Sequence, residues 1–261
     1  MAKYLLTIAK FNDVRQLIFD QFISPRNKEF CEVQGYEYIE VKDIVPYRNS
    51  GTWQKLLNVK KLLDEGKVKD GDHLTVIDAD MCIMDARFPL WSEKPFTYAI
   101  DSCNTHCMGY YSIKVCDWSR RLIDNILNEE NYQNHGNTDF WKMWAEQSSF
   151  YFITGIQRHS DIPFTELENC GFGLFNRPET VYTPQELLEN IEIRDVHYNV
   201  TYVVSEMDSQ LNNTPEADRF YINPNEFDKT IIRHFAGGQP WNHYYFSLPL
   251  KNKNWQAPSK A

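Results

Sequence analysis

Apolar residues alternate between strand-like and helix-like spacing along the first half of the chain. Residues 4–9 form a short β-rich run, and residues 16–23 then repeat apolar side chains at the interval of a helix. Residues 35–41 alternate as a half-buried strand does, residues 53–65 carry one apolar helical face, and residues 73–77 form a continuous apolar run. This succession of strands and helices predicts an α/β fold of the βαβ type with a mostly parallel central sheet flanked by helices.

The second half of the chain is less regular. The same spacing rules predict two further strands and two further helices: residues 96–100 and 110–113, and residues 118–127 and 140–153. Later strand candidates, residues 198–205 and 230–235, are short and lie among loops rich in Pro and Asn. No repeat or linker divides the sequence, so residues 1–261 are predicted to form one domain with a looser C-terminal region.

Composition and charge narrow the range of partners. The 261 residues carry a formal net charge of -9, and this gives no general attraction to nucleic acid or anionic lipid. The first apolar run, residues 4–9, is too short for a signal-peptide core or a membrane span. We therefore expect a cytoplasmic protein with no membrane span, which suits a bacterial or viral enzyme.

Two carboxylates follow the most apolar strand. Asp78 and Asp80 come directly after residues 73–77, with Ala79 between them. Ligands of open α/β sheets bind at the carboxyl edge of the strands, and hard oxygen ligands suit Mg²⁺ or Mn²⁺ that also holds a diphosphate. The alternative interpretation is that the two aspartates only end a strand and cap the following turn.

A second segment adds a nitrogen ligand and a flexible turn. A β-branched strand ends at His234, and Gly237 and Gly238 follow shortly after it. The imidazole can supply a third metal ligand, and backbone N–H groups of a Gly-Gly turn can approach a phosphate. Alone, a histidine before a glycine turn is more often a structural residue.

Six short segments occur in the order found in one known class of enzyme. They are Asn27-Lys28-Glu29-Phe30-Cys31 with Gly35-Tyr36-Glu37-Tyr38, the helix of residues 53–63 with Lys55, Asp78-Ala79-Asp80, Lys114-Val115-Cys116-Asp117-Trp118-Ser119, Glu146-Gln147-Ser148, and His234-Phe235-Ala236-Gly237. Together they resemble the metal-dependent, nucleotide-sugar glycosyltransferases of the GT-A (Rossmann-like) fold. The resemblance is strongest to the retaining family of xyloglucan xylosyltransferases, galactomannan galactosyltransferases and fungal α-1,6-mannosyltransferases.

The resemblance implies a role for each matching position. Asp78, Asp80 and His234 would bind Mn²⁺ or Mg²⁺, and Gln147 would lie near the anomeric carbon with Glu146 beside it. The nucleotide and its diphosphate would contact Ala9, Lys10, Phe11, Asn12, Lys55, Ala79, Gly237 and Gly238. Apart from the resemblance, we predict that the donor sugar or the acceptor contacts Asp101, Gly109, Tyr110 and Trp241, because aromatic rings in loops can stack on sugar faces. Residues 1–100 would form the nucleotide-binding half, and residues 101–261 the acceptor-binding half with the closing metal and phosphate loop.

Two departures from the family pattern concern the donor. The family's lysine after the closing His motif is missing, since Gly238-Gln239-Pro240 stands there. The diphosphate must find another cation, for which Arg233, Lys251 and Lys253 are candidates, or rely on backbone donors and the metal. The family's sugar-pocket segment is replaced by Cys107-Met108-Gly109-Tyr110-Tyr111, so the sequence does not fix the donor sugar.

The sequence thus predicts a metal-dependent glycosyltransferase that retains the anomeric configuration. A UDP-sugar is the favoured donor and a GDP-sugar the second. The acceptor stays open among a glycan, a lipid-linked sugar, a protein and a modified nucleobase, as does the oligomeric state. Asp101, Asp139, Glu146 and Glu168 are possible bases or acceptor ligands. Two alternatives remain, namely a phosphohydrolase of the haloacid-dehalogenase type and a non-catalytic nucleotide-sugar binding module.

Overall fold

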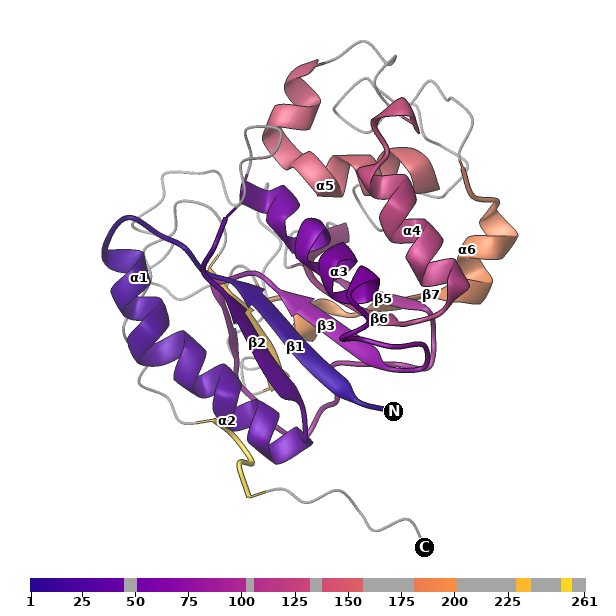
Figure 1. Cartoon of the computed structure of the whole chain (residues 1–261). Helices are drawn as coiled ribbons and strands as arrows, with labels where there is room; N and C mark the ends of the chain where they lie inside the picture. The colour runs from indigo at the N-terminus through magenta and orange to yellow at the C-terminus, as the bar shows by residue number, and fades with distance from the viewer. Residues whose placement is uncertain are drawn as a thin grey trace, which may run out of the picture.

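A six-stranded sheet forms the centre of the protein (Figure 1). The computed structural model describes residues 1–44, 51–101, 106–131, 138–156, 181–200, 229–235 and 250–254. The sheet has the order β2-β1-β3-β6-β5-β7. Its strands are β1 (Lys3–Ile8), β2 (Glu37–Val41), β3 (His73–Ile77), β5 (Phe96–Ile100), β6 (His106–Lys114) and β7 (Ile191–Arg194).

The direction of the strands confirms the predicted mixed α/β class. β1 pairs in parallel with β2 and β3, and β5 pairs in parallel with β7. Only β6 runs against its neighbours in this sheet, because it pairs antiparallel with both β3 and β5. The sheet is therefore mostly parallel, and its parallel strands β1 and β3 end at a common carboxyl edge.

Helices cover both faces of the sheet because successive strand residues point to opposite sides. Leu6, Val76 and Tyr111 face a core made with α3 (Gln54–Asp64), α4 (Asp117–Leu127) and α5 (Thr138–Thr154). Their neighbours Leu5 and Ile77 face the other core, which includes residues of α2 (Ser24–Gln34). Figure 1 shows α3, α4 and α5 grouped together, away from α2. The sheet is thus the middle layer of three.

One long helical segment follows the loop after β1. It consists of α1 (Val14–Ile18), a π-helical turn (Phe19–Ile23) and α2, and it ends at Gly35, whose φ of 67° suits glycine. The predicted helix of residues 16–23 is therefore only the beginning of a longer segment. Asp13 begins α1, because its side chain accepts the backbone N–H of Arg15 at 2.9 Å.

Several elements differ from the sequence prediction. The strand of residues 110–113 extends to all of β6, and the strand of residues 230–235 shortens to β8 (Ile232–His234). β4 (Met81–Ile83), α6 (Pro184–Asn190) and β7 were not predicted. The expected strand of residues 198–205 lies mostly outside the described residues. Short 3₁₀ turns complete the described elements: Gly51–Trp53, Glu129–Asn131 and Val196–Tyr198. No helix among the described residues is long and apolar enough to cross a membrane.

A buried asparagine fixes the position of β4. Asn27 has no exposed surface, and its amide donates to the carbonyl of Met81 at 3.2 Å. Its side-chain oxygen accepts the N–H of Ile83 at 3.1 Å. β4 also pairs antiparallel with β8, with Met81 opposite His234. Asn27 therefore holds one side of a two-stranded sheet, while β8 holds the other.

Replacing Asn27 by Leu should destabilise the fold by about 2–4 kcal/mol, since two buried backbone groups of β4 lose their partners. Urea unfolding would measure the loss. Lys28→Ala is the matched control, because the Lys28 side chain is 54% exposed and its ion pair with Glu40 spans 3.7 Å. Such exposed pairs contribute roughly 0–1 kcal/mol. Equal stability of Asn27→Leu and the wild type would contradict the role given to Asn27.

Candidate functional site

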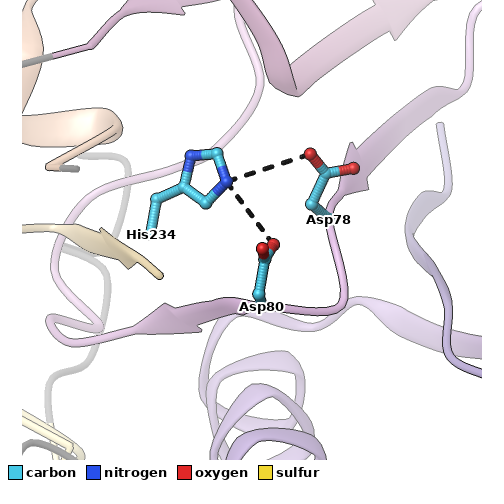
Figure 2. A group of neighbouring side chains, drawn as sticks. All are labelled: Asp78, Asp80 and His234. Atoms are coloured by element: carbon cyan, nitrogen blue, oxygen red, sulfur yellow. Dashed lines mark ion pairs between the residues drawn. The ribbon is translucent and has the colours of Figure 1, made fainter. Parts of the chain in front are cut away.

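Three potential metal ligands meet at the carboxyl edge of the sheet. Asp78 follows β3 directly, Asp80 lies in the turn before β4, and His234 ends β8. One ligand atom from each lies within 4.8 Å of the others. The Nε2 atom of His234 is 3.4 Å from Oδ1 of Asp80 and 4.0 Å from Oδ2 of Asp78, and Figure 2 shows this nitrogen directed at both carboxylates. The structure therefore brings together three residues that the sequence singled out separately.

Backbone hydrogen bonds fix this arrangement. The N–H of Asp78 donates to the carbonyl of Gly109 on β6 at 2.8 Å, and the N–H of Met81 donates to the carbonyl of Asp78 at 3.0 Å to close the turn. The N–H of Phe235 donates to the carbonyl of Asp80 at 2.9 Å. Because β8 is aligned with β4 in this way, a histidine more than 150 positions away in the sequence reaches the aspartates.

The donor set fits a divalent cation. Two carboxylates and one imidazole are ligands that Mn²⁺ accepts, and Mg²⁺ accepts the carboxylates. The Asp78 and Asp80 side chains are 30% and 24% exposed, which leaves a side of the group open to a ligand. The Nδ1 atom of His234 lies 2.8 Å from Oδ1 of Asn199, so a neutral His234 that donates its Nδ1–H to this oxygen would offer the lone pair of Nε2 to a cation.

The charges of the site depend on one another. Burial, and then the nearby charge of Asp80, raise the pKa of Asp78. Burial alone would also raise the pKa of Asp80, but His234 outweighs it and lowers that pKa. Burial would lower the pKa of His234, but Asp80 raises it well above its ordinary value. The charges of Asp80 and His234 therefore stabilise each other, and a divalent cation at this place would favour the ionised form of both carboxylates.

The absence of a side chain at Gly109 makes room for the side chains of Met81, His234 and Asp78. A Cβ atom at this position would lie 2.7 Å from Cε of Met81, 2.9 Å from Cε1 of His234 and 3.1 Å from Oδ2 of Asp78. No ordinary side chain fits there unless the ligands move. Sequence reasoning proposed Gly109 as a sugar or acceptor contact, and the structure places it against the candidate metal ligands.

A buried lysine lies behind Asp78. The Nζ atom of Lys55 is 2.7 Å from Oδ1 of Asp78 and 2.9 Å from Oε1 of Glu146, and it donates to the carbonyl of Met108 at 3.0 Å. Burial would lower the pKa of Lys55, but Asp78 and Glu146 outweigh it and raise the pKa well above its ordinary value. The ammonium group thus has a partner for each of its three protons. A direct diphosphate contact from Lys55 stays a prediction.

Glu146 and Gln147 lie in α5, next to this lysine. Glu146 is buried and uses one carboxylate oxygen on Lys55. The side-chain oxygen of Gln147 accepts the N–H of Met108 at 2.8 Å. This bond leaves the two N–H donors of the Gln147 amide without a partner among the described residues. Glu146 therefore contacts Lys55, and Gln147 contacts β6.

The proposed nucleotide loop lies beside the aspartates. Ala9 and Ala79 are buried in one apolar cluster together with Phe235, and Phe11 packs against that cluster. Lys10 and Asn12 are exposed. The loop after β1 is therefore in contact with the turn that carries the aspartates, while the nucleotide contacts themselves stay a prediction.

The remaining predicted contacts with the sugar, the acceptor and the phosphate fall into three groups: one core residue, one half-buried residue, and residues outside the described part of the chain. Tyr110 has no exposed surface and donates to the carbonyl of Leu90 at 2.8 Å, as a core residue does, so we leave it out of the proposed site. Asp101 is half-buried at the end of β5. Three of the predicted residues lie outside the described residues: Gly237, Gly238 and Trp241. The side chain of Asp139 and residue Glu168 also lie outside them.

Sequence reasoning missed Asn199. It is fully buried, directly follows the 3₁₀ turn Val196–Tyr198 and bonds His234, next to the isolated bridge between Val200 and Arg233. No local pattern marks it, because its role depends on a hydrogen bond to a residue 35 positions away.

Comparison with solved structures identifies the fold. No protein-family profile and no curated protein sequence matches the chain. A solved glycosyltransferase involved in the glycosylation of the major capsid of PBCV-1 aligns with 93% of this chain and 98% of its own, at 8% identity and a TM-score of 0.53. The chain has a glycosyltransferase GT-A fold.

Two further solved glycosyltransferases align less closely with this GT-A domain. GlyE of Streptococcus pneumoniae TIGR4 covers 93% of this chain and 56% of its own, with 11% identity and a TM-score of 0.48. The galactosyltransferase LgtC, solved with donor and acceptor sugar analogues, covers 96% of this chain and 92% of its own, with 11% identity and a TM-score of 0.43.

Gly109→Ala should weaken Mn²⁺ binding by roughly tenfold or more, because the added methyl group separates His234 from Asp78. Titration calorimetry would measure the affinity, and circular dichroism would show that the fold persists. Gly51→Ala is the control, since a Cβ at that position meets nothing within 4 Å. Unchanged Mn²⁺ affinity in Gly109→Ala would show that the metal binds elsewhere.

Asn199→Ala should also weaken Mn²⁺ binding, by roughly 10- to 100-fold, because the imidazole of His234 loses the acceptor that fixes its tautomer and ring orientation. Asn199→Asp keeps an acceptor at the same position and should recover much of the affinity. A merely structural role would make both variants lose stability without this recovery. Wild-type Mn²⁺ affinity in the alanine variant would contradict the assignment.

Proposed function

We propose that this protein is a metal-dependent glycosyltransferase that moves a sugar from a nucleotide-sugar to an acceptor hydroxyl. The observation that carries the proposal is the group of Asp78, Asp80 and His234 at the carboxyl edge of a GT-A sheet. Neither part alone is enough, because acidic groups are common and folds host many functions. Their combination supports binding of a divalent cation, Mn²⁺ or Mg²⁺, together with a diphosphate.

The main chemical task of such an enzyme is to stabilise the leaving diphosphate. Glycosyl transfer breaks the bond between the anomeric carbon and a phosphate oxygen, and negative charge accumulates on the nucleoside diphosphate. A divalent cation held by Asp78, Asp80 and His234 would stabilise that charge as a Lewis acid, which contributes several kcal/mol. Asn199 and Gly109 would keep the ligands in place.

The contacts of Glu146 and Gln147 support retention of configuration. An inverting enzyme needs a carboxylate base on the face opposite the leaving group, whereas Glu146 is buried and paired with Lys55. In a retaining reaction the leaving phosphate itself takes the acceptor proton. We assign Gln147 the role of steadying the oxocarbenium-like centre with its amide oxygen, which keeps a second lone pair beside the one that accepts the N–H of Met108.

The resemblance to the xyloglucan xylosyltransferase and α-1,6-mannosyltransferase family supports a UDP-sugar as donor, with a GDP-sugar second. We place the nucleotide against residues 9–13 and the acceptor against residues 101–261. The acceptor class stays open among a glycan, a lipid-linked sugar, a protein and a modified nucleobase. We also propose that the enzyme acts in the cytoplasm.

Incubation with UDP- and GDP-sugars and Mn²⁺ should release UDP or GDP, and chelation of the metal should stop the release. Asp80→Asn, which keeps the size of the side chain and removes its charge, should lower the rate by roughly 100-fold or more. Liquid chromatography of the nucleotide products would measure both effects.

The other outcomes separate the competing functions. Release of inorganic phosphate from phosphate esters, without nucleoside diphosphate, would favour the haloacid-dehalogenase alternative. Metal-dependent binding of a nucleotide-sugar without any turnover would favour a binding module. No binding and no release with any donor would overturn the proposed function.

A further inference from the structure

The proposed site needs a positive charge beyond the metal. Asp78, Asp80 and Glu146 are acidic, and Lys55 with a divalent cation would balance their charges before a donor arrives. The diphosphate of a nucleotide-sugar adds two negative charges, and a third develops as the sugar leaves. No Lys or Arg occurs in residues 235–250, directly after His234. The diphosphate would therefore use a cation from another part of the chain, or backbone donors together with the metal.

The cations that the sequence offered for binding the diphosphate have other partners or lie away from the aspartates. Arg233 is buried, and its guanidinium donates to the carbonyl of Val200 at 2.7 Å and lies over the ring of Phe235. The backbone of Lys251 forms a β-bridge with that of Asp85, beyond the end of β4 that is far from His234, and Lys253 follows it closely in the chain. Lys55 already has three partners.

Arg15 is an exposed cation at the same edge of the sheet as the aspartates. It lies in the first turn of α1, directly after the loop of residues 9–13, and its side chain is 48% exposed. The guanidinium lies 5.2 Å from the centre of the Phe11 ring, and Phe11 packs against the cluster that contains Ala79. The hydrogen bonds that Arg15 donates to Asp13 raise the pKa of Arg15, and the charge of Asp80 acts in the same direction.

We propose that Arg15 is the cation that binds the diphosphate of the donor, in place of the lysine that this sequence lacks; this inference rests on the proposed function. A guanidinium suits the task, because its planar fork can bind two phosphate oxygens at once.

Asp13 holds Arg15 until the donor binds. Two oxygens of Asp13 accept from Nε of Arg15, both at 2.9 Å, and Oδ2 lies 2.6 Å from Nη2. Both side chains are nearly half exposed, so the pair is weak and exchangeable. The diphosphate would therefore compete with a single carboxylate for the guanidinium, and the charge of that carboxylate opposes donor binding.

Calorimetric titration of UDP and GDP with Mn²⁺ tests the proposal. Arg15→Ala should weaken binding of the better nucleotide by roughly 10- to 100-fold, and Arg15→Lys should recover part of the loss. Binding of the matching nucleoside, measured by competition, should not change, because it carries no phosphate. Asp13→Asn still caps α1 and should tighten binding by a few fold, since the competing charge is gone.

Two further variants serve as comparisons. Arg120→Ala removes an exposed arginine that is 2.8 Å from Asp70, before the amino end of β3, and should leave binding unchanged. Lys10→Ala tests the other cation of the loop. If the wild type binds neither nucleotide, the proposed function fails. If it binds and Arg15→Ala binds equally well, loses nucleoside binding to the same extent, or loses less than Lys10→Ala, the inference about Arg15 is wrong while the proposed function stands.

Discussion

A buried ammonium group determines how the elements around the site are positioned. Lys55 of α3 contacts the end of β3 through Asp78, α5 through Glu146 and β6 through the carbonyl of Met108. Taking such a charge out of water costs several kcal/mol, and only a complete set of partners offsets that cost. The three elements are therefore held at fixed positions around Lys55. One oxygen of Asp78 is used in this way, and the other is left facing His234.

The sequence identified this edge of the sheet because its local signals are strong. Residues 73–77 form a continuous apolar run between two polar turns, and the observed β3 has the same bounds. Because the end of this strand is clear from the sequence, the residues that follow it must lie at the carboxyl edge of the sheet, and Asp78 and Asp80 could be assigned to that edge. His234 was placed at the end of a strand for the same reason, although β8 is shorter than expected.

The parts of the fold and of the candidate site that the sequence did not predict depend on contacts between distant residues, which no local pattern encodes. β4 has three residues and β7 has four, and each is a strand only because a partner strand lies beside it. Period-two spacing puts Tyr110 and Tyr111 on opposite faces, but it does not say that both faces are covered, so the burial of Tyr110 does not follow from its place in the strand. Asn199 and Arg15 gain their positions only once β8 and α1 are folded against the aspartates.

The distribution of charge explains how a protein of net charge -9 could bind an anion. Net charge describes the average field, whereas a diphosphate responds to the few groups that it touches. The carboxylates of Asp78 and Asp80 repel a diphosphate in the absence of a cation and position one when it is present, so the same residues would make donor binding conditional on the metal. A single exposed arginine held by one aspartate would then supply the rest of the positive charge. On the proposed function, this electrostatic coupling would favour binding of the metal before the donor or together with it.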